Sequence, residues 1–387
     1  MSIAVPEAGL GVWADLVGQG KLVSVLRRAV SQEPHAMTHA WLFVGPPGSG
    51  RSNAAKAFAA ALQCPRGGCG ECQTCLSVRG GTHPDVTLVR TEKLSIGVDE
   101  VRQLVRSAAL APATGPYQIL VIEDADRVTE RGADALLKSL EEPAPRTVWM
   151  LCAPTSEDVV VTIRSRCRMA ELVTPSEQAI SELLRRRDGI DPPTAEFAAR
   201  VAQGHIGRAR SLASSSEARE RRVEMLSIPA KLHSLGACLD SAQALVQAAT
   251  AEAAAITAEL DAAEWARLQE TLGISGSRTR PRHAAAALAE LEEQQKKRST
   301  RLQRDCLDRV LTELTSYYRD VLMRQTDSGK ALINLEFNSD IQHLAASSTP
   351  AATLRKLDAI LACRRELMAN VTALLAMESL LIALSEQ

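Results

Sequence analysis

The chain is poor in aromatic residues, has no long hydrophobic run, and carries charges that nearly cancel. Aromatics make up 3% of its 387 residues, and the chain has 45 basic and 46 acidic side chains. A net charge of −1 excludes a global attraction to nucleic acid or to an anionic membrane, so any DNA contact must be local. No apolar run approaches the roughly 18 residues of a membrane span, and the first ten residues lack the form of a signal peptide. We therefore expect a cytoplasmic protein with no membrane partner.

Length and hydrophobic pattern predict an α/β region followed by an all-α region. At about 150 residues per domain, the chain should hold two or three domains. Short apolar runs alternate with helical patterns in the first half, which predicts a mainly parallel sheet covered on both faces, with ligands at the strand carboxyl ends. The predicted strands are 41–44, 85–89, 117–122 and 147–152, and the predicted helices are 53–62, 96–110 and 133–142. The second half is rich in Ala and Leu, which favours helix packed on helix.

Residues 45–52 read Gly-Pro-Pro-Gly-Ser-Gly-Arg-Ser, a phosphate-binding loop with Arg51 where the pattern asks for lysine. A strand before it and a helix after it give the order that such a loop requires. Backbone N–H groups of the loop cradle phosphate, and the lysine reaches the β- and γ-phosphates. Because a guanidinium fork is bulkier and has a different reach, we expect the loop to persist while nucleotide binding is weakened and hydrolysis is weak or absent. The candidate contacts are Gly45, Gly48, Gly50, Arg51 and Ser52.

Two acids follow the predicted strand that ends at residue 122. Carboxylates at this place in a phosphate-loop enzyme hold Mg²⁺ and activate the attacking water. Here the order is Glu123-Asp124, whereas an active site usually has Asp-Glu, so the second acid is one methylene short of the water. Acids at a strand end are also common as plain solvated groups. Together with the altered loop, they predict a degenerate nucleotide site in which ATP and Mg²⁺ bind weakly or not at all.

Four of the nine cysteines fall within twelve residues, at Cys64, Cys69, Cys72 and Cys75. In a reducing compartment such a cluster indicates metal ligands more than disulfides. The two C-x-x-C steps share Cys72 and allow thiolates to converge tetrahedrally on Zn²⁺, with glycines at 67, 68 and 70 for the tight turns. Four thiolates leave no open coordination position, so the predicted zinc is structural. Free thiols are the alternative, since the step from Cys64 to Cys69 departs from the usual spacing.

Two further motifs occur downstream: Leu-Leu-Lys-Ser-Leu-Glu-Glu-Pro at 136–143 and Ser-Arg-Cys at 165–167. With a cysteine knuckle inserted after the phosphate-loop helix, they resemble the AAA+ clamp loaders of bacterial DNA polymerase III. The resemblance covers residues 41–168. It implies that Arg166 projects into a neighbouring subunit's ATP site, where a permanently charged fork stabilises the transferring phosphoryl group. Taken alone, Arg166 would be read as a surface arginine in a salt bridge.

The resemblance also implies a subunit that is not a motor. The motor's polar sensing residue falls near Thr155, where its identity is unclear. The slot of the motor's lid arginine falls on Gly207, and Arg208 comes one residue late, which rotates its side chain by about 100°. Together with Arg51 in place of lysine and the Glu123-Asp124 order, these are four departures from the ATP site of a motor subunit. The implied partners are the clamp-loader subunits gamma/tau and delta, the beta sliding clamp, and primer-template DNA through the assembled complex.

The implied domains are an AAA+ nucleotide-binding-like domain at 1–174 with the zinc knuckle at 64–75, a helical lid at 175–225, and a helical collar at 226–387. Apolar stripes in 306–324 and 352–386 must be buried in a bundle or against partners, and core packing alone would explain them. The segment 241–300 predicts two helices joined by a basic loop at 273–282, which is either solvated or touches phosphate. Two rivals stay open: an active ATPase of the same fold, and a zinc-stabilised phosphate-loop regulator or kinase.

Overall fold

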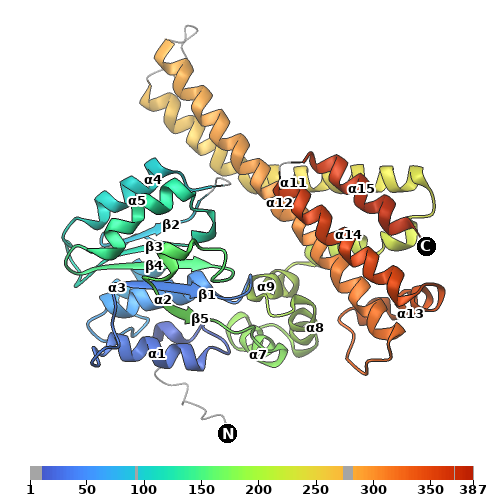
Figure 1. Cartoon of the computed structure of the whole chain (residues 1–387), viewed down its shortest axis with the longest axis horizontal. Coiled ribbons are helices and arrows are strands. Elements are labelled where there is room, and N and C mark those ends of the chain that lie inside the picture. The colour runs from blue at the N-terminus through green and yellow to red at the C-terminus, as the bar shows by residue number, and fades with distance from the viewer. Residues whose placement is uncertain (1–10, 92–94, 273–281, 370, 387) are drawn as a thin grey trace. The chain divides into compact units, whose positions relative to one another are not determined.

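The computed structural model describes residues 11–91, 95–272, 282–369 and 371–386 (Figure 1). The chain divides into two compact units, Met1–Ser214 and Ser215–Gln387. Among the described residues, no helix has both the length and the apolar character needed to cross a membrane. The finer domain boundaries expected from the sequence, at 174/175 and 225/226, stay predictions.

A parallel sheet of five strands forms the centre of the first unit, in the order β2-β3-β4-β1-β5. The strands are β1 (Ala40–Val44), β2 (Val86–Val89), β3 (Gln118–Ile122), β4 (Thr147–Ala153) and β5 (Arg168–Glu171). Every residue of β1, β3 and β4 is buried, which explains their continuous apolar runs. The first four strands confirm the sequence predictions. The edge strand β5 gave no such signal, because only one of its four residues is buried.

Helices cover both faces of this sheet, as Figure 1 shows. On one face the strand residues Trp41 and Phe43 pack against η1, α1, α2 and α3, and on the other Leu42 and Val44 share a core with α4, α5 and α6. The bounds are η1 (Gly11–Trp13), α1 (Gly20–Val30), α2 (Arg51–Gln63), α3 (Gln73–Arg79), α4 (Val98–Ala108), η2 (Ala125–Arg127), α5 (Glu130–Glu141) and α6 (Val161–Arg164). The alternation of side chains along each strand therefore builds two hydrophobic layers.

Three short helices complete the first unit: α7 (Glu177–Asp188), α8 (Pro192–Ala202) and α9 (Ile206–Ser214). We call α7 to α9 the lid helices. The hydroxyl of Ser176 caps α7, and the carboxylate of Asp191 caps α8 by accepting from the Thr194 N–H. Pro192 and Pro193 occupy the first helical positions of α8, where a missing N–H costs nothing. The predicted break between two helices at these prolines is confirmed.

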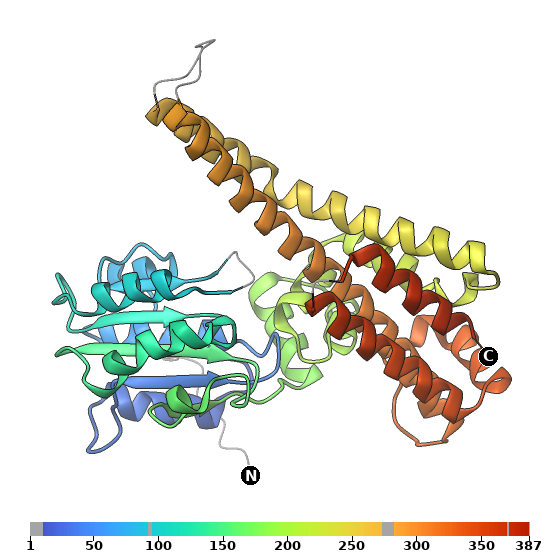
Figure 2. The same cartoon turned by 45° about the horizontal axis from the view of Figure 1, so that its top comes forward.

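The second unit is entirely helical among its described residues. Its elements are α10 (Ser216–Leu226), η3 (Pro229–Lys231), α11 (Leu235–Thr271), α12 (Arg282–Gln325), η4 (Leu335–Phe337), α13 (Asn338–Ser347), α14 (Pro350–Met368) and α15 (Ala373–Ser385). The long helices α11 and α12 lie side by side in both views (Figure 2). The predicted basic loop lies outside the described residues, apart from the backbone of Arg282 at the start of α12.

The apolar stripe predicted in 306–324 is buried inside the second unit, where Leu307, Leu311, Leu314 and Tyr318 belong to one core. The stripe predicted across 352–386 is divided between α14 and α15, because the chain leaves the helix after Met368. On α14, Leu354 and Leu361 are each 49% exposed. Part of this second stripe therefore faces solvent in the single chain.

Candidate functional site

The phosphate loop connects β1 to α2 at the carboxyl end of the sheet. Gly48 (φ 79°) and Gly50 (φ 96°) have left-handed backbone, which explains why glycine stands at both positions. Arg51 is the first residue of α2, and its Nη1 donates to the carbonyl oxygen of Gly45 at 2.7 Å. The guanidinium thus bonds the backbone of its own loop. The hydroxyl of Ser49 is buried and has no hydrogen-bond partner in the part of the chain that the structure describes.

The acids predicted for this site lie beside the loop. Glu123 follows β3 directly and pairs with Lys56 of α2, with Nζ and Oε1 2.6 Å apart. Asp124 lies 4.0 Å from Arg127 Nε. Beneath them the thiol of Cys152 is fully buried in β4, and burial raises its pKa to about 12, with Glu123 and Arg51 among the charges acting on it. The structure therefore gathers the loop and the acid pair, and it adds Lys56 to them.

A lid residue, His205, lies directly on the phosphate loop. A Cβ added to Gly48 would come within 2.1 Å of the His205 ring, and the N–H of Ile206 donates to the Gly48 carbonyl at 3.2 Å. The ring nitrogen Nδ1 accepts the Arg208 N–H at 3.1 Å, so His205 also caps α9. Burial lowers the pKa of His205, and the charges of Arg208 and Arg51 act in the same direction. No sequence pattern identified His205 as a residue of this site, because only the folded chain brings Gly48 and His205 together.

The structure gives the contacts of the two positions that were compared with the motor's sensing groups. The N–H and the hydroxyl of Thr155 both donate to Asp158 Oδ2 at 2.9 Å, in the loop after β4. Gly207 lies in the first turn of α9, with the His205 ring 3.4 Å from the place of a Cβ. Their part in any nucleotide site stays a prediction.

Arg166 lies in the turn between α6 and β5, and its hydrogen bonds are to residues outside the phosphate loop. Its Nε donates to Glu141 Oε1 at 2.8 Å, and its Nη2 donates to the same oxygen. Its Nη1 donates to the carbonyl oxygen of Thr162 at 2.8 Å and to the hydroxyl of Ser165 at 3.2 Å. Within the single chain, the guanidinium is thus tied to the last residue of α5. Its role in a neighbouring site is untested.

The four clustered cysteines meet between α2 and α3. Their sulfur atoms all lie within 4.8 Å of one another, and Cys64 Sγ is 3.8 Å from Cys69 Sγ and 3.7 Å from Cys72 Sγ. Four thiolates at about 2.3 Å from a tetrahedral Zn²⁺ would be separated by about 3.8 Å, so the donor set fits this ion. Gly67, Gly68 and Gly70 all have positive φ, as the tight turns require.

Local hydrogen bonds favour the thiolate form of part of this cluster. The backbone N–H of Cys75 lowers the pKa of the Cys72 thiol to about 6. Burial would raise the pKa of Cys64, but N–H groups of Cys69, Gly68 and Arg66 outweigh it and the pKa is lowered. Burial raises the pKa of Cys75. A metal binds the thiolate form of cysteine, and these backbone N–H groups favour that form. The cluster could therefore hold a zinc ion.

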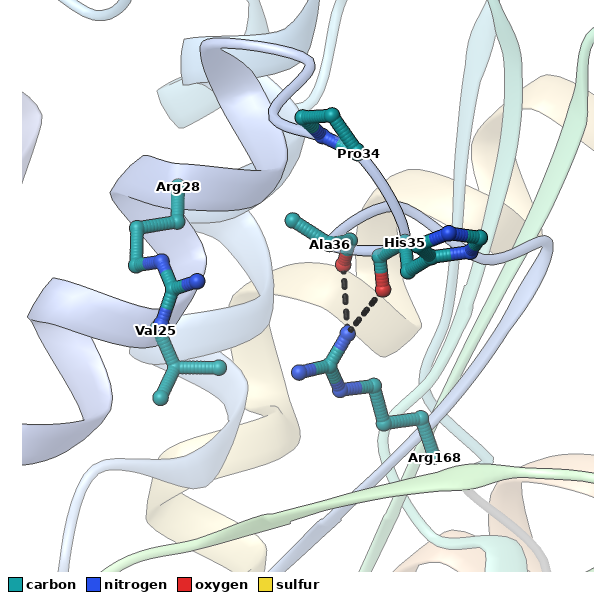
Figure 3. A pocket seen from close by; sticks show the side chains of 6 residues that line it. All are labelled: Val25, Arg28, Pro34, His35, Ala36 and Arg168. Atoms are coloured by element: carbon teal, nitrogen blue, oxygen red, sulfur yellow. Dashed lines mark hydrogen bonds between the residues drawn. The ribbon is translucent and has the colours of Figure 1, made fainter.

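A small cavity at the opposite end of the sheet belongs to none of these sites. It measures about 160 Å³ and lies between α1 and the start of β5, with Arg28 and Arg168 on its two sides (Figure 3). Arg168 donates to the carbonyl oxygens of His35 and Ala36, and its guanidinium lies 5.1 Å from the ring of Trp41. Arg28 pairs with Glu33 at 2.6 Å. Both arginines thus have structural partners.

Comparison with known proteins finds relatives of the first unit. A family model described as DNA polymerase III, delta subunit, matches residues 18–176. The delta' subunit of DNA polymerase III from Pseudomonas aeruginosa is 38% identical over 154 residues, which are 38% of this chain and 47% of that protein. The tau subunit from Bacillus subtilis is 32% identical over 170 residues, which are 43% of this chain and 30% of that protein.

A gamma-subunit-related protein from Thermotoga maritima is a looser structural match, with 15% identity and a TM-score of 0.46 over 93% of this chain and 97% of that one. The chain spans about half or less of the length of the first curated relatives that it matches. The matched residues include the phosphate loop, the cysteine cluster and the Ser-Arg-Cys turn. Over this region the chain is similar to clamp-loader subunits of DNA polymerase III, both delta' and gamma/tau.

Proposed function

We propose that this protein is a delta'-type subunit of the DNA polymerase III clamp loader. It would assemble with gamma/tau and delta subunits, and the complex would open the beta sliding clamp and place it on primed DNA. In this proposal the chain is a non-motor arm of the assembly. The similarity of 38% identity to the delta' subunit from Pseudomonas aeruginosa supports the choice of a delta'-type subunit.

The observation that carries the proposal is the contact between Arg51 and its own loop. A motor's lysine must reach the β- and γ-phosphates, but here Arg51 Nη1 donates to the carbonyl oxygen of Gly45. The neighbouring acid Glu123 is paired with Lys56 and the lid residue His205 lies on Gly48. These contacts engage Arg51, Glu123 and Gly48 within the chain itself, so turnover in this site would be weak or absent.

Arg166 would act outside its own chain. Phosphoryl transfer spreads negative charge over the equatorial oxygens, and a permanently charged guanidinium in the site lowers the energy of that transition state. The side chain of Arg166 is 35% exposed, which leaves it accessible to another subunit. The cysteine cluster would hold a structural Zn²⁺ that fixes the segment after α2, without any part in catalysis.

One observation favours a second candidate, an active gamma/tau-like ATPase. The buried hydroxyl of Ser49 has no partner among the described residues, as would be expected of a group waiting for a phosphate oxygen. In that case Arg51 would take over the lysine's role when nucleotide binds.

The DNA-stimulated ATPase rate of the reconstituted clamp loader separates the two candidates. We expect Arg166→Ala in this chain to lower the rate while Arg51→Ala leaves it unchanged. Arg164→Ala is the matched control, because Arg164 lies two residues away and pairs with Glu157 of its own chain. If Arg51→Ala removes a share of turnover comparable to that lost with Arg166→Ala, the site is a working one and the non-motor assignment is wrong.

A further inference from the structure

Arg166 is oriented by a carboxylate from a distant part of the sequence. Glu141, the last residue of α5, accepts from both Nε and Nη2 through one oxygen. The two residues are 25 positions apart in the chain, and Glu141 belongs to the Leu-Leu-Lys-Ser-Leu-Glu-Glu-Pro motif. No role for this glutamate followed from the sequence.

The contact is poorly suited to a purely stabilising role. The side chains of Arg166 and Glu141 are 35% and 49% exposed, and exposed ion pairs typically contribute less than about 1 kcal/mol to folding. A pair in which one carboxylate oxygen takes two guanidinium N–H groups does, however, fix the plane of the guanidinium. The Thr162 carbonyl then holds Nη1 from the other side.

The remaining donors point to the purpose of this arrangement. A guanidinium has five N–H groups, and Glu141 and Thr162 take three of them. A fourth reaches Ser165 at the longer distance of 3.2 Å, and one on Nη2 remains. The N–H groups that a ligand would take are therefore the free one on Nη2 and, in exchange for Ser165, the second one on Nη1; two N–H groups on the terminal nitrogens can bind a phosphate group together.

We propose that Glu141 is a positioning residue for Arg166: it holds the Nε edge so that the terminal nitrogens face the nucleotide of the neighbouring subunit. This inference rests on the function proposed above. Glu141 touches no reacting atom and acts through Arg166 alone. Its loss lets the guanidinium rotate away, and small misplacements of a group that binds the transition state are costly in rate.

Steady-state ATPase kinetics of the reconstituted clamp loader test this role. We expect Glu141→Ala to lower kcat about three- to tenfold and to change KM for ATP less than about twofold, because the arginine acts on the transition state. Glu141→Gln should keep most of the rate, since the amide oxygen still accepts from Nε. Glu142→Gln is the matched control, because the side chain of the neighbouring Glu142 has no hydrogen bond or ion pair within the described ranges.

The double variant Glu141→Ala/Arg166→Ala distinguishes positioning from a general structural effect. If Glu141 acts only through Arg166, the double variant has the same kcat as Arg166→Ala. A further loss in the double variant, or a wild-type kcat for Glu141→Ala beside a lowered kcat for Arg166→Ala, would overturn the proposal.

A second measurement on the isolated full chain tests the contact itself. In spectra of arginine side chains labelled with ¹⁵N, the Arg166 Nε–H should exchange slowly in the wild type and in Glu142→Gln, and rapidly in Glu141→Ala. Unchanged exchange in Glu141→Ala overturns the inference without touching the proposed function. If instead Arg166→Ala leaves the ATPase rate intact, the proposed function fails, and the positioning role fails with it.

Discussion

At the scale of single residues, Asp85 shows how a buried charge is accommodated. Its carboxylate is 1% exposed and accepts the backbone N–H groups of Ala113, Thr114 and Gly115 at 2.6–2.8 Å. Burial alone would raise the pKa of Asp85, but these three donors and the Thr114 hydroxyl lower it to about 2. The carboxylate therefore closes the loop that leads into β3.

We predict that Asp85→Asn lowers the free energy of unfolding by about 2 kcal/mol at pH 7, because the amide keeps an acceptor but loses the charge. The folded pKa lies below the unfolded value of 3.8, so this stabilisation is complete above about pH 4 and is lost as the pH falls towards 2. Urea unfolding at pH 7, 5, 4 and 3 checks it. Asp99→Asn, on a side chain 90% exposed, is the control. If the difference in unfolding free energy between the wild type and Asp85→Asn stayed constant with pH, this explanation would be contradicted.

The contact of His205 with Gly48 gives a second prediction at this scale. Gly48→Ala would place a methyl group 2.1 Å from the ring, whereas the same change at Gly50 meets nothing within 4 Å. Both positions have positive φ, so the backbone strain is shared and only the clash differs. We expect Gly48→Ala, but not Gly50→Ala, to speed hydrogen exchange at the Ile206 N–H.

His205→Ala removes the ring that the added methyl group would strike, although it also removes the cap of α9. The double variant Gly48→Ala/His205→Ala should therefore exchange at the rate of His205→Ala alone. Equal exchange in Gly48→Ala and Gly50→Ala would show that the ring does not lie on the loop.

At the scale of elements, the cysteine cluster joins the end of α2 to the start of α3. Gly68 packs against Val12, and its carbonyl oxygen accepts the Val12 N–H at 3.0 Å, so the knuckle also holds η1. A segment with so many glycines has little core of its own, and a bound metal would supply the missing stability.

We predict that the purified protein contains one Zn²⁺ per chain and that Cys72→Ser lowers both the zinc content and the thermal midpoint. Elemental analysis and calorimetry measure the two effects. Cys238→Ser should retain the zinc, because Cys238 lies on α11 in the hydrophobic core of the second unit. A full zinc content in Cys72→Ser would exclude the cluster as the binding site.

At the scale of the whole molecule, each unit has its own means of holding its elements together. In the second unit this includes a buried polar network centred on Arg222 of α10. Arg222 is 3% exposed, and its Nε donates to Glu313 Oε2 of α12 at 3.1 Å. Its Nη2 donates to Asn334 Oδ1, and Asn334 in turn donates to the buried Asp320. The network joins α10 to α12 and to the segment before η4.

We predict that Arg222→Ala destabilises the second unit by about 3–5 kcal/mol, because Glu313 is left buried without its cation. Faster hydrogen exchange in α10 and α12, with unchanged zinc content in the first unit, is the expected result. Arg221→Ala, on an exposed residue of the same helix, is the control. A urea midpoint equal to the wild type would mean that this network adds no net stability.

The sequence by itself determined most of the first unit. Apolar runs defined β1 to β4, and the clearest were those of β1, β3 and β4, because strands buried on both faces carry few polar residues. Glycine spacing defined the phosphate loop, and cysteine spacing defined a cluster whose sulfurs do converge. In each case the information is local: the residues that make the element are neighbours in the chain, and their order reflects its backbone geometry directly.

Only the tertiary structure decided what the isolated motifs touch. The contacts of Arg166 with Glu141, of Glu123 with Lys56 and of His205 with Gly48 join residues 25 to 157 positions apart. Such pairs leave no periodic pattern, since each depends on where whole elements pack. The edge strand β5 was missed for a related reason: with one of four residues buried, its pairing with β1 depends on backbone hydrogen bonds, to which every residue contributes alike.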